Sequence, residues 1–411
     1  MRCGLLGRKL GHSYSPQIHR CLGNYDYDLF EREPECLQSF FRSEEFDGIN
    51  VTIPYKKAVI PYCDQLSETA KKLGAVNTIV HHQDGLLIGH NTDYFGFSAM
   101  VQQSGLSVAG KKALVLGSGG ASATAVAVLN ELGAKTIVIS RTGTDNYENL
   151  DRHCDAAVIV NATPVGMYPN VGVSPVDLSR FPHLEGVLDL IYNPARTKLL
   201  LDAEERGIVA MNGLWMLVAQ AKESAEWFTG EKISDDKIVQ IHNSLQNQMQ
   251  NIVLIGMPGS GKTTIGKLLS ERLGRKFVDS DAFITEEAGM SIPEIFKSSG
   301  EPGFRKIESK ILAELGMKSG LIIATGGGCV TVKDNYRSLR QNGTMVWLQR
   351  NINNLPTDGR PLSQTQNLLQ MFEARKPLYA HFADYTIDNN TSIQLAADEI
   401  VRRFVNENTH Y

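Results

Sequence analysis

The sequence of 411 residues has few features of a secreted, membrane-spanning or metal-clustering protein. Its six cysteines are scattered and include no C-x-x-C pair, which argues against a zinc site or disulfide framework and favours a reducing, cytoplasmic compartment. No apolar run approaches about 18 residues and no apolar leader opens the chain, so neither membrane spanning nor secretion is expected. A net charge of −4 gives no general attraction to nucleic acid or anionic membranes, so we expect small-molecule partners.

The chain is too long for one ordinary hydrophobic core, and its length predicts about two or three domains. Short apolar runs alternate with helical patterns, which favours an α/β fold. The clearest example is a predicted strand at 113–116, a helix at 121–132 and a second strand at 136–139, with further strands at 157–160 and 186–190. A helix-rich stretch from 214 to about 245 ends in the polar segment 246–250, the best candidate for a linker.

Residues 256–263 fit the phosphate-binding template G-x-x-x-x-G-K-[ST]. Closely spaced glycines let backbone N–H groups surround the phosphates of a nucleotide, Lys262 would reach the outer phosphates, and Thr263 would offer its hydroxyl to Mg²⁺. An apolar run at 252–255 and helical spacing over 264–273 give the strand, loop and helix setting that this site requires. The setting favours a nucleotide site over a chance glycine turn. The loop alone does not name the acceptor, because ATPases, GTPases and small-molecule kinases share it.

A second glycine-rich loop, at 117–122, approximates G-x-G-x-x-G with Ser122 in place of the third glycine. Because it lies between a predicted strand and helix, the helix N-terminus can face the pyrophosphate of a dinucleotide; a plain tight turn is the alternative. After the next strand comes Arg141, where an NAD site would place an acidic residue. Arginine favours the 2′-phosphate of NADP, although a solvated surface arginine is the other interpretation.

The first 245 residues contain further motifs in the order of one enzyme family. They are Gly11-His-Ser13-Tyr-Ser15-Pro16, Asn50-Val-Thr52-Ile-Pro54-Tyr-Lys56, Gly74-Ala-Val-Asn77-Thr78, Asn91-Thr92-Asp93, Asn161-Ala-Thr163, Asp189-Leu-Ile-Tyr192-Asn-Pro194 and Met216-Leu-Val-Ala-Gln220. This part of the chain resembles shikimate dehydrogenase. The resemblance implies a Rossmann-like cofactor domain and NADPH-dependent reduction of 3-dehydroshikimate to shikimate.

The resemblance implies that Lys56 and Asp93 form the catalytic pair. Hydride addition to a ketone develops alkoxide charge, so a lysine held by a carboxylate suits a general acid. For the substrate it implies Ser13, Ser15, Thr52, Asn77, Tyr192 and Gln220. For NADP it implies Gly117, Gly119, Gly120, Ala121, Ser140, Arg141, Thr142 and Gly213. Taken singly, most of these residues would be interpreted as turn residues or surface charges; the ordered set favours the functional interpretation. The segment 142–160 is short for the family, which affects the adenosine end of the NADP site most.

The chain after residue 251 contains a second ordered set of motifs around the phosphate loop. They are Phe277-Val-Asp279-Ser-Asp281, Gly300-Glu-Pro-Gly-Phe304-Arg305-Lys-Ile-Glu308, Gly326-Gly327-Gly328, Gly359-Arg360-Pro-Leu362 and Arg375-Lys-Pro-Leu-Tyr379. This set resembles shikimate kinase, which implies a P-loop α/β domain that transfers phosphate from ATP to shikimate with Mg²⁺.

Phosphoryl transfer requires positioning and charge neutralisation, and the kinase resemblance supplies residues for both. Thr263 and Asp279 would hold Mg²⁺, Asp281 would accept the proton of the attacking hydroxyl, and Arg360 would meet the transferring group from a lid. Lys262 joins them as a catalytic residue. For ATP it implies Gly259, Ser260, Gly261, Lys262, Thr263 and Thr264, and for the substrate Arg305, Gly327 and Arg375, whose guanidinium groups suit a carboxylate. The lid at 351–358 is short and polar.

These observations predict a bifunctional enzyme whose first product is its second substrate. The expected domains are a substrate and catalytic domain at 1–93 and 213–245, an NADP domain at 94–212, a linker at 246–250 and a kinase domain at 251–411. Two alternatives stay open: a quinate/shikimate-type dehydrogenase fused to a small-molecule kinase, and a non-catalytic sensor of shikimate-like ligands. A homo-oligomer is compatible with the sequence, which does not specify the oligomeric state.

Overall fold

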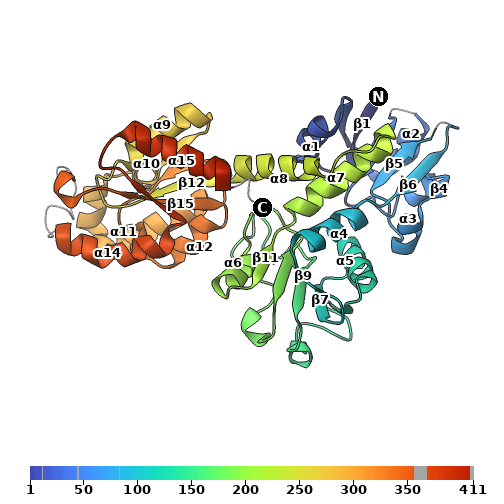
Figure 1. Ribbon diagram of the computed structural model, residues 1–411, viewed down its shortest axis with the longest axis horizontal. Helices are drawn as coiled ribbons and strands as arrows, with labels where there is room; N and C mark the ends of the chain where they lie inside the picture. Colours follow the sequence, from blue (N-terminus) through green and yellow to red (C-terminus); the bar gives the residue numbers. More distant parts are fainter. Residues whose placement is uncertain (12, 44–45, 83, 356–367, 408–411) are drawn as a thin grey trace. The chain divides into compact units, whose positions relative to one another are not determined.

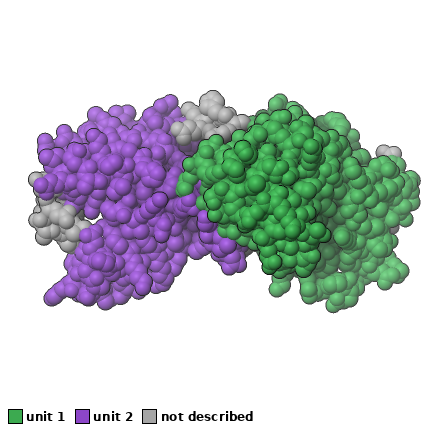
Figure 2. Space-filling model, turned by 90° about the horizontal axis from the view of Figure 1, so that it is seen from below, with its two compact units in different colours: residues 1–165, 174–192, 202–242 green, residues 166–173, 193–201, 243–411 purple. Residues whose placement is uncertain are grey.

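The computed structural model describes residues 1–411 except 12, 44–45, 83, 356–367 and 408–411. The chain divides into two compact units, coloured in Figure 2. Unit 1 consists of residues 1–165, 174–192 and 202–242. Unit 2 consists of residues 166–173, 193–201 and 243–411. In the part of the chain that the structure describes, no helix is both long and apolar enough to cross a membrane.

The first sheet of unit 1 is mixed, in the order β2-β1-β3-β5-β6-β4. Its strands are β1 (Arg2–Gly7), β2 (Asp26–Glu31), β3 (Gly48–Val51), β4 (Gln65–Leu66), β5 (Thr78–His81) and β6 (Leu87–His90). Strands β2, β1 and β3 are parallel, whereas β5 runs antiparallel to both β3 and β6. Helices α1 (Ser15–Leu22), α2 (Leu37–Arg42) and α3 (Glu68–Leu73) accompany this sheet. The carboxyl end of β3 leads into the loop with Lys56.

The second sheet of unit 1 is fully parallel, in the order β11-β10-β9-β7-β8. Its strands are β7 (Lys112–Leu116), β8 (Lys135–Ile139), β9 (Val158–Asn161), β10 (Gly186–Asp189) and β11 (Val209–Met211). Helix α5 (Gly120–Glu131) joins β7 to β8, as the alternation of apolar runs predicted. Between β8 and β9 the chain forms a 3-10 helix, η3 (Leu150–His153), in place of a full helix, in agreement with the short segment noted in the sequence.

Four further helices complete this part of the chain: α4 (Asp93–Gln103), α6 (Lys198–Glu205), α7 (Leu214–Thr229) and α8 (Asp236–Met249). Helix α8 includes residues 246–249, which the sequence favoured as a linker. The physical reason is that Met249 continues a buried apolar stripe with Ile238, Ile241 and Leu245, at helical spacing. Glutamines and asparagines around Met249 obscured this stripe. The predicted domain boundaries remain a prediction.

Unit 2 contains a parallel sheet in the order β13-β14-β12-β15-β16, with helices on both faces (Figure 1). Its strands are β12 (Asn251–Ile255), β13 (Phe277–Asp279), β14 (Ile322–Ala324), β15 (Gly343–Gln349) and β16 (Tyr385–Asp388). Its helices are α9 (Lys262–Leu273), α10 (Ser280–Ala288), α11 (Ile292–Gly316), α12 (Asp334–Arg340), α14 (Leu368–Phe382) and α15 (Ile393–Glu407). Buried apolar clusters line both faces of the sheet. The α/β class is confirmed, and the carboxyl ends of β12, β13 and β14 all lead into one cleft.

Candidate functional site

Lys56 and Asp93, 37 residues apart in the sequence, form an ion pair in unit 1. The distance between Lys56 Nζ and Asp93 Oδ2 is 2.5 Å, and the two side chains are 29% and 15% exposed. Lys56 lies in the loop after β3, where its carbonyl oxygen accepts the N–H of Val76 at 2.7 Å. Asp93 is the first residue of α4. The pair is therefore partly shielded from solvent, as a proton donor and its orienting carboxylate require.

Asn77 and Gln220 meet at Thr92, the residue that precedes Asp93. The Thr92 N–H donates to Asn77 Oδ1 at 2.7 Å, and Asn77 Nδ2 donates to Thr92 Oγ1 at 3.0 Å. Gln220 Oε1, from α7, lies 3.4 Å from Thr92 Oγ1. We assigned no role to Thr92 from the sequence, although it stands inside the motif that contains Asp93. The structure makes it the link between two predicted substrate residues and the predicted catalytic pair.

Ser13 and Ser15, two of the predicted substrate residues, lie at the start of α1. Ser13 Oγ accepts the N–H of Ser15 at 3.2 Å, and Tyr14 packs edge-on against Tyr192 with ring centroids 6.1 Å apart. Burial raises the pKa of Tyr192, so its phenol stays a neutral hydrogen-bonding group. Thr52 follows β3, and its N–H bonds the Leu6 carbonyl oxygen at 2.9 Å. Ser13, Ser15 and Tyr192 are thus brought to one region by Tyr14.

The glycine-rich loop after β7 has the open space that a dinucleotide requires. A Cβ atom at Gly119 or Gly120 would meet nothing within 4 Å, so a pyrophosphate can approach the N-terminus of α5. Gly117 has φ +105° and donates its N–H to the Ile139 carbonyl oxygen at 2.8 Å. Ser122, at the third glycine position, donates its hydroxyl to the Gly117 carbonyl oxygen at 2.6 Å. The serine therefore stabilises the loop through a hydrogen bond that a glycine could not make.

The other predicted NADP residues lie in α5 or follow strands of the same sheet. Ala121 lies in the first turn of α5. Ser140, Arg141 and Thr142 directly follow β8, which pairs with β7, so they lie at the same sheet edge as the loop. At Gly213, a Cβ atom would lie 2.2 Å from the Leu190 carbonyl oxygen. Close packing at the start of α7 therefore accounts for a glycine at position 213 without any contact to NADP.

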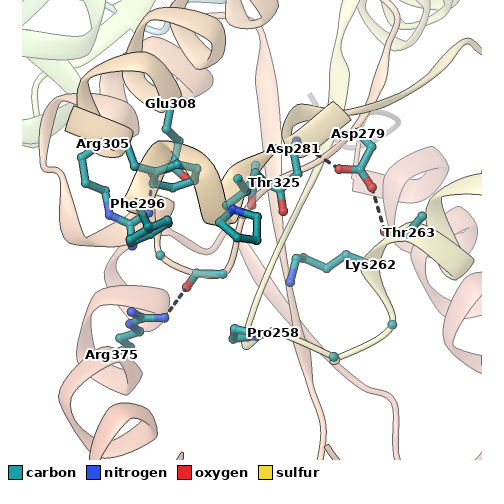
Figure 3. A pocket seen from close by; sticks show the side chains of 18 of the residues that line it. Pro258, Lys262, Thr263, Asp279, Asp281, Phe296, Arg305, Glu308, Thr325 and Arg375 are labelled. Carbon is teal, nitrogen blue, oxygen red and sulfur yellow. Dashed lines mark hydrogen bonds and ion pairs between the residues drawn. The ribbon is translucent and has the colours of Figure 1, made fainter. Parts of the chain in front are cut away.

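Unit 2 has a cleft of about 420 Å³ whose wall includes the phosphate loop (Figure 3). Gly259 and Gly261 have φ +83° and +97°, conformations that favour glycine. Lys262 Nζ donates to the carbonyl oxygens of Gly256 and Met257, both at 2.9 Å. Thr264 also lines the cleft, and Ser260 is fully buried beneath it. The loop and its lysine therefore have the geometry of a nucleotide phosphate site.

Thr263 and Asp279 form the predicted magnesium site. Thr263 Oγ1 donates to Asp279 Oδ2 at 2.8 Å, and Asp279 Oδ1 accepts the N–H of Asp281 at 3.1 Å. A hydroxyl and a carboxylate are suitable ligands for Mg²⁺, which binds few protein groups and takes the rest from water and phosphate.

The opposite end of the cleft is cationic, with Arg305 and Arg375 on the left of Figure 3. Arg305 Nη1 donates to Glu308 Oε2 at 2.6 Å, and its Nη2 donates to Glu301 Oε1 at 2.9 Å. Arg375 Nη1 donates to the Gly327 carbonyl oxygen at 3.1 Å. A Cβ atom at Gly328 would lie 2.0 Å from Arg305 Nη2, so the glycine-rich turn leaves room for this guanidinium.

Three residues without a predicted role support this cleft. Glu308 is fully buried beneath Arg305, and burial raises its pKa although the arginine opposes the shift. Arg350 Nη1 lies 3.3 Å from the Gly259 carbonyl oxygen, and Asn389 Nδ2 lies 2.7 Å from that of Ser260. The spacing of Arg305 and Glu308 along a helix could have indicated their pairing. Arg360, predicted as a lid residue, lies outside the described residues.

Comparison with known proteins gives a family for each part. Residues 5–79 match the model of the shikimate dehydrogenase substrate binding domain, and residues 258–407 match that of shikimate kinase. The chain is 35% identical over 274 residues to a shikimate dehydrogenase (NADP(+)) of Caldicellulosiruptor bescii, covering 59% of this chain and 94% of the relative.

Two solved structures are similar to the same part. Shikimate dehydrogenase 1 from Peptoclostridium difficile has 40% identity and a TM-score of 0.55, covering 60% of this chain and 97% of that one. The Thermus thermophilus enzyme in complex with NADP(H) and shikimate has 29% identity and a TM-score of 0.55, covering 59% and 99%. The chain belongs to the shikimate dehydrogenase family in its N-terminal part and carries a shikimate kinase domain in its C-terminal part.

Proposed function

We propose that this chain is a bifunctional enzyme that reduces 3-dehydroshikimate to shikimate with NADPH and phosphorylates shikimate to shikimate 3-phosphate with ATP. The two family assignments support this pair of reactions. The observation that carries the dehydrogenase half is the shielded Lys56–Asp93 pair. The observation that carries the kinase half is a cleft that holds a phosphate loop at one end and two arginines at the other.

In the dehydrogenase half, bound NADPH supplies the hydride, and the residues of the chain manage the proton. Lys56 donates its proton to the ketone oxygen as negative charge develops there, and Asp93 holds the ammonium group in place. Asn77 and Gln220 orient the ring through its hydroxyls. Ser13, Ser15 and Tyr192 bind the ring carboxylate with neutral donors, and Thr52 completes the rim.

In the kinase half, bound ATP with Mg²⁺ supplies the phosphoryl group. The loop from Gly259 to Thr264 holds the phosphates, Lys262 neutralises their charge, and Thr263 with Asp279 positions the metal. Asp281 accepts the proton of the attacking hydroxyl. Arg305 and Arg375 bind the carboxylate of the ring and place that hydroxyl, while the backbone at Gly327 faces the ring. Arg360 lies outside the described residues, and its role at the transferring group stays a prediction from the sequence.

A coupled assay tests the proposal. Purified protein receives 3-dehydroshikimate, NADPH, ATP and Mg²⁺, and both NADPH loss and shikimate 3-phosphate are followed. We expect both, with phosphorylation dependent on the first step. If no phosphorylated product forms although NADPH is consumed, the kinase half of the proposal is wrong. Replacing shikimate by quinate in the reverse reaction separates a shikimate enzyme from a quinate enzyme, and turnover of either substrate excludes a purely ligand-sensing protein.

Small molecules are the partners that this function requires. A cytoplasmic location and independence of nucleic acid and membranes stay predictions from the sequence. The oligomeric state is open to direct measurement by light scattering, and a homo-oligomer would be compatible with both reactions.

A further inference from the structure

A cluster of buried polar side chains lies behind the predicted substrate residues of unit 1. At its centre, Ser224 Oγ lies 2.9 Å from the Gln220 carbonyl oxygen, 2.8 Å from Asn50 Nδ2 and 3.0 Å from Thr92 Oγ1. Ser224 is fully buried, and Asn50 and Thr92 are 5% and 2% exposed. We define the Ser224 cluster as Asn50, Asn77, Thr78, Thr92, Gln220 and Ser224. These residues come from two strand ends, the residue before α4, and α7.

The direction of the hydrogen bonds at Ser224 follows from its neighbours. A carbonyl oxygen only accepts, so the single Ser224 hydroxyl proton goes to Gln220. Ser224 Oγ must then accept from Asn50 Nδ2 and from a neighbouring hydroxyl. Asn50 is oriented accordingly, because its Oδ1 accepts the Tyr27 hydroxyl at 2.8 Å. The Thr92 hydroxyl, 3.0 Å away, fills the second acceptor position of Ser224, and the Thr78 hydroxyl donates to Asn77 Oδ1 at 3.2 Å.

The two predicted substrate amides are oriented by the same logic. A backbone N–H only donates, so the Asn77 atom 2.7 Å from the Thr92 nitrogen must be its oxygen. Gln220 Nε2 donates to the Leu217 carbonyl oxygen at 2.9 Å, which leaves Gln220 Oε1 directed to Thr92. Both amide oxygens therefore face Thr92 within the protein. In the described part of the chain, each amide nitrogen has one bonded N–H and one N–H for which no protein acceptor is found.

We propose that Ser224 is a positioning residue of the dehydrogenase. It accepts the Thr92 proton, so that Thr92 Oγ1 is left to accept from Asn77 Nδ2 and the Asn77 oxygen faces the Thr92 N–H. The substrate then meets only N–H donors from these two amides, and the site selects rings with acceptor oxygens at the matching positions. This inference rests on the proposed dehydrogenase activity and extends it to a residue that does not touch the substrate.

The test is Ser224→Ala in the full-length protein. Without the hydroxyl, Asn50 and Thr92 lose an acceptor, and the Thr92 proton can turn to Asn77 Oδ1 or Gln220 Oε1, which disturbs the orientation of Asn77. We expect the KM for 3-dehydroshikimate to rise about tenfold, the effect of one net hydrogen bond of about 1.4 kcal/mol. The kcat should stay within about twofold and the KM for NADPH should not change, since Lys56 and the NADP loop lie outside the cluster.

Thr229→Ala is the matched control. Thr229 lies in the same helix and bonds the Ala225 carbonyl oxygen at 2.9 Å, the same pattern that Ser224 makes with Gln220, but it is not in the cluster. It should leave both KM values unchanged. A double-mutant cycle adds Asn77→Ala to Ser224→Ala. If Ser224 acts through Asn77, the combined rise in KM should be clearly smaller than the product of the single effects.

Unchanged KM in Ser224→Ala, independent effects in the cycle, or an equal change in Thr229→Ala would each overturn the proposal. If Ser224→Ala does not fold, Ser224→Cys replaces it, because a thiol keeps the volume and weakens the hydrogen bonds; a smaller rise in KM supports the proposal and no rise overturns it. These outcomes presuppose an active parent protein. A parent without NADPH oxidation would instead contradict the proposed function.

Discussion

The predicted dehydrogenase and kinase sites bind the same kind of molecule, a hydroxylated ring acid, with different chemistry. The residues predicted to bind substrate in the first site are neutral hydroxyls, amides and a phenol, and its only ion pair in the described structure of the site is Lys56–Asp93. The second uses guanidinium groups held by carboxylates, such as Arg305 between Glu301 and Glu308. Neutral groups are positioned by backbone N–H and carbonyl partners, whereas charged groups need counter-charges. The side chains that bind the same kind of ligand are therefore held in place by backbone groups in one site and by carboxylates in the other.

The largest effect should come from removing the lysine of the neutral site. Lys56→Ala should lower NADPH oxidation about 10³-fold, within the range for loss of a general acid, and leave phosphorylation of added shikimate intact. Lys57→Ala, at an exposed neighbouring lysine, is the control. Both reactions are measured on one preparation. Loss of both activities in a folded Lys56→Ala protein would show that the two sites are not separable.

A slightly smaller effect is expected in the charged site. Asp281→Asn should lower shikimate phosphorylation about 10²-fold or more, because an amide cannot accept the proton of the attacking hydroxyl. NADPH oxidation should be unaffected. The control is Asp334→Asn, at an exposed aspartate at the start of α12. The measurement is the steady-state rate of shikimate phosphorylation at saturating ATP. Full activity in Asp281→Asn would show that this residue is not the proton acceptor.

The neutral character of unit 1 should also appear in its acid stability. His90 is 5% exposed, no described residue bonds either ring nitrogen, and burial lowers its pKa to about 4. Because the unfolded chain binds a proton at His90 more readily than the folded chain, the free energy of unfolding is highest above the unfolded pKa of about 6.5. It decreases as the pH falls from about 6.5 toward 4. The loss is on the order of 3 kcal/mol. Urea unfolding across this range should show a shallower pH slope of the unfolding free energy for His90→Gln than for the parent, and an equal slope would contradict the prediction.

The smallest expected effect concerns the shape of one charged group. Arg305→Lys keeps the charge but loses the fork that spans Glu301 and Glu308, so the KM for shikimate should rise about tenfold. The KM for ATP should not change. Lys306→Ala, at an exposed neighbour in α11, is the control. An equal rise in both KM values would mean that Arg305 supports the whole cleft and not the carboxylate alone.

Local patterns predicted the parallel elements well, because buried strands and amphipathic helices carry their own periodicity. The run from 112 to 139 forms β7, α5 and β8 within one or two residues of the prediction. Long-range groupings had no such signal. Ser224 lies 174 residues from Asn50 and 132 from Thr92, so only the folded chain brings them together. The Lys56–Asp93 pair was predicted through family resemblance, because nothing in its spacing indicates contact. Glu308 was missed although its distance of three residues from Arg305 on a helix predicts pairing.

Helix α7 carries Gly213 against the Leu190 carbonyl oxygen at its start, then Gln220 and Ser224 one turn apart on one face. Each residue inserted or deleted between the first and the last of these would rotate everything after it by about 100° and shift it by about 1.5 Å. Such a change would turn Gln220 away from Thr92 while leaving composition and hydrophobicity almost unchanged. During divergence, this stretch is therefore expected to tolerate substitutions but not changes in length, and its residue count is itself an inherited functional property.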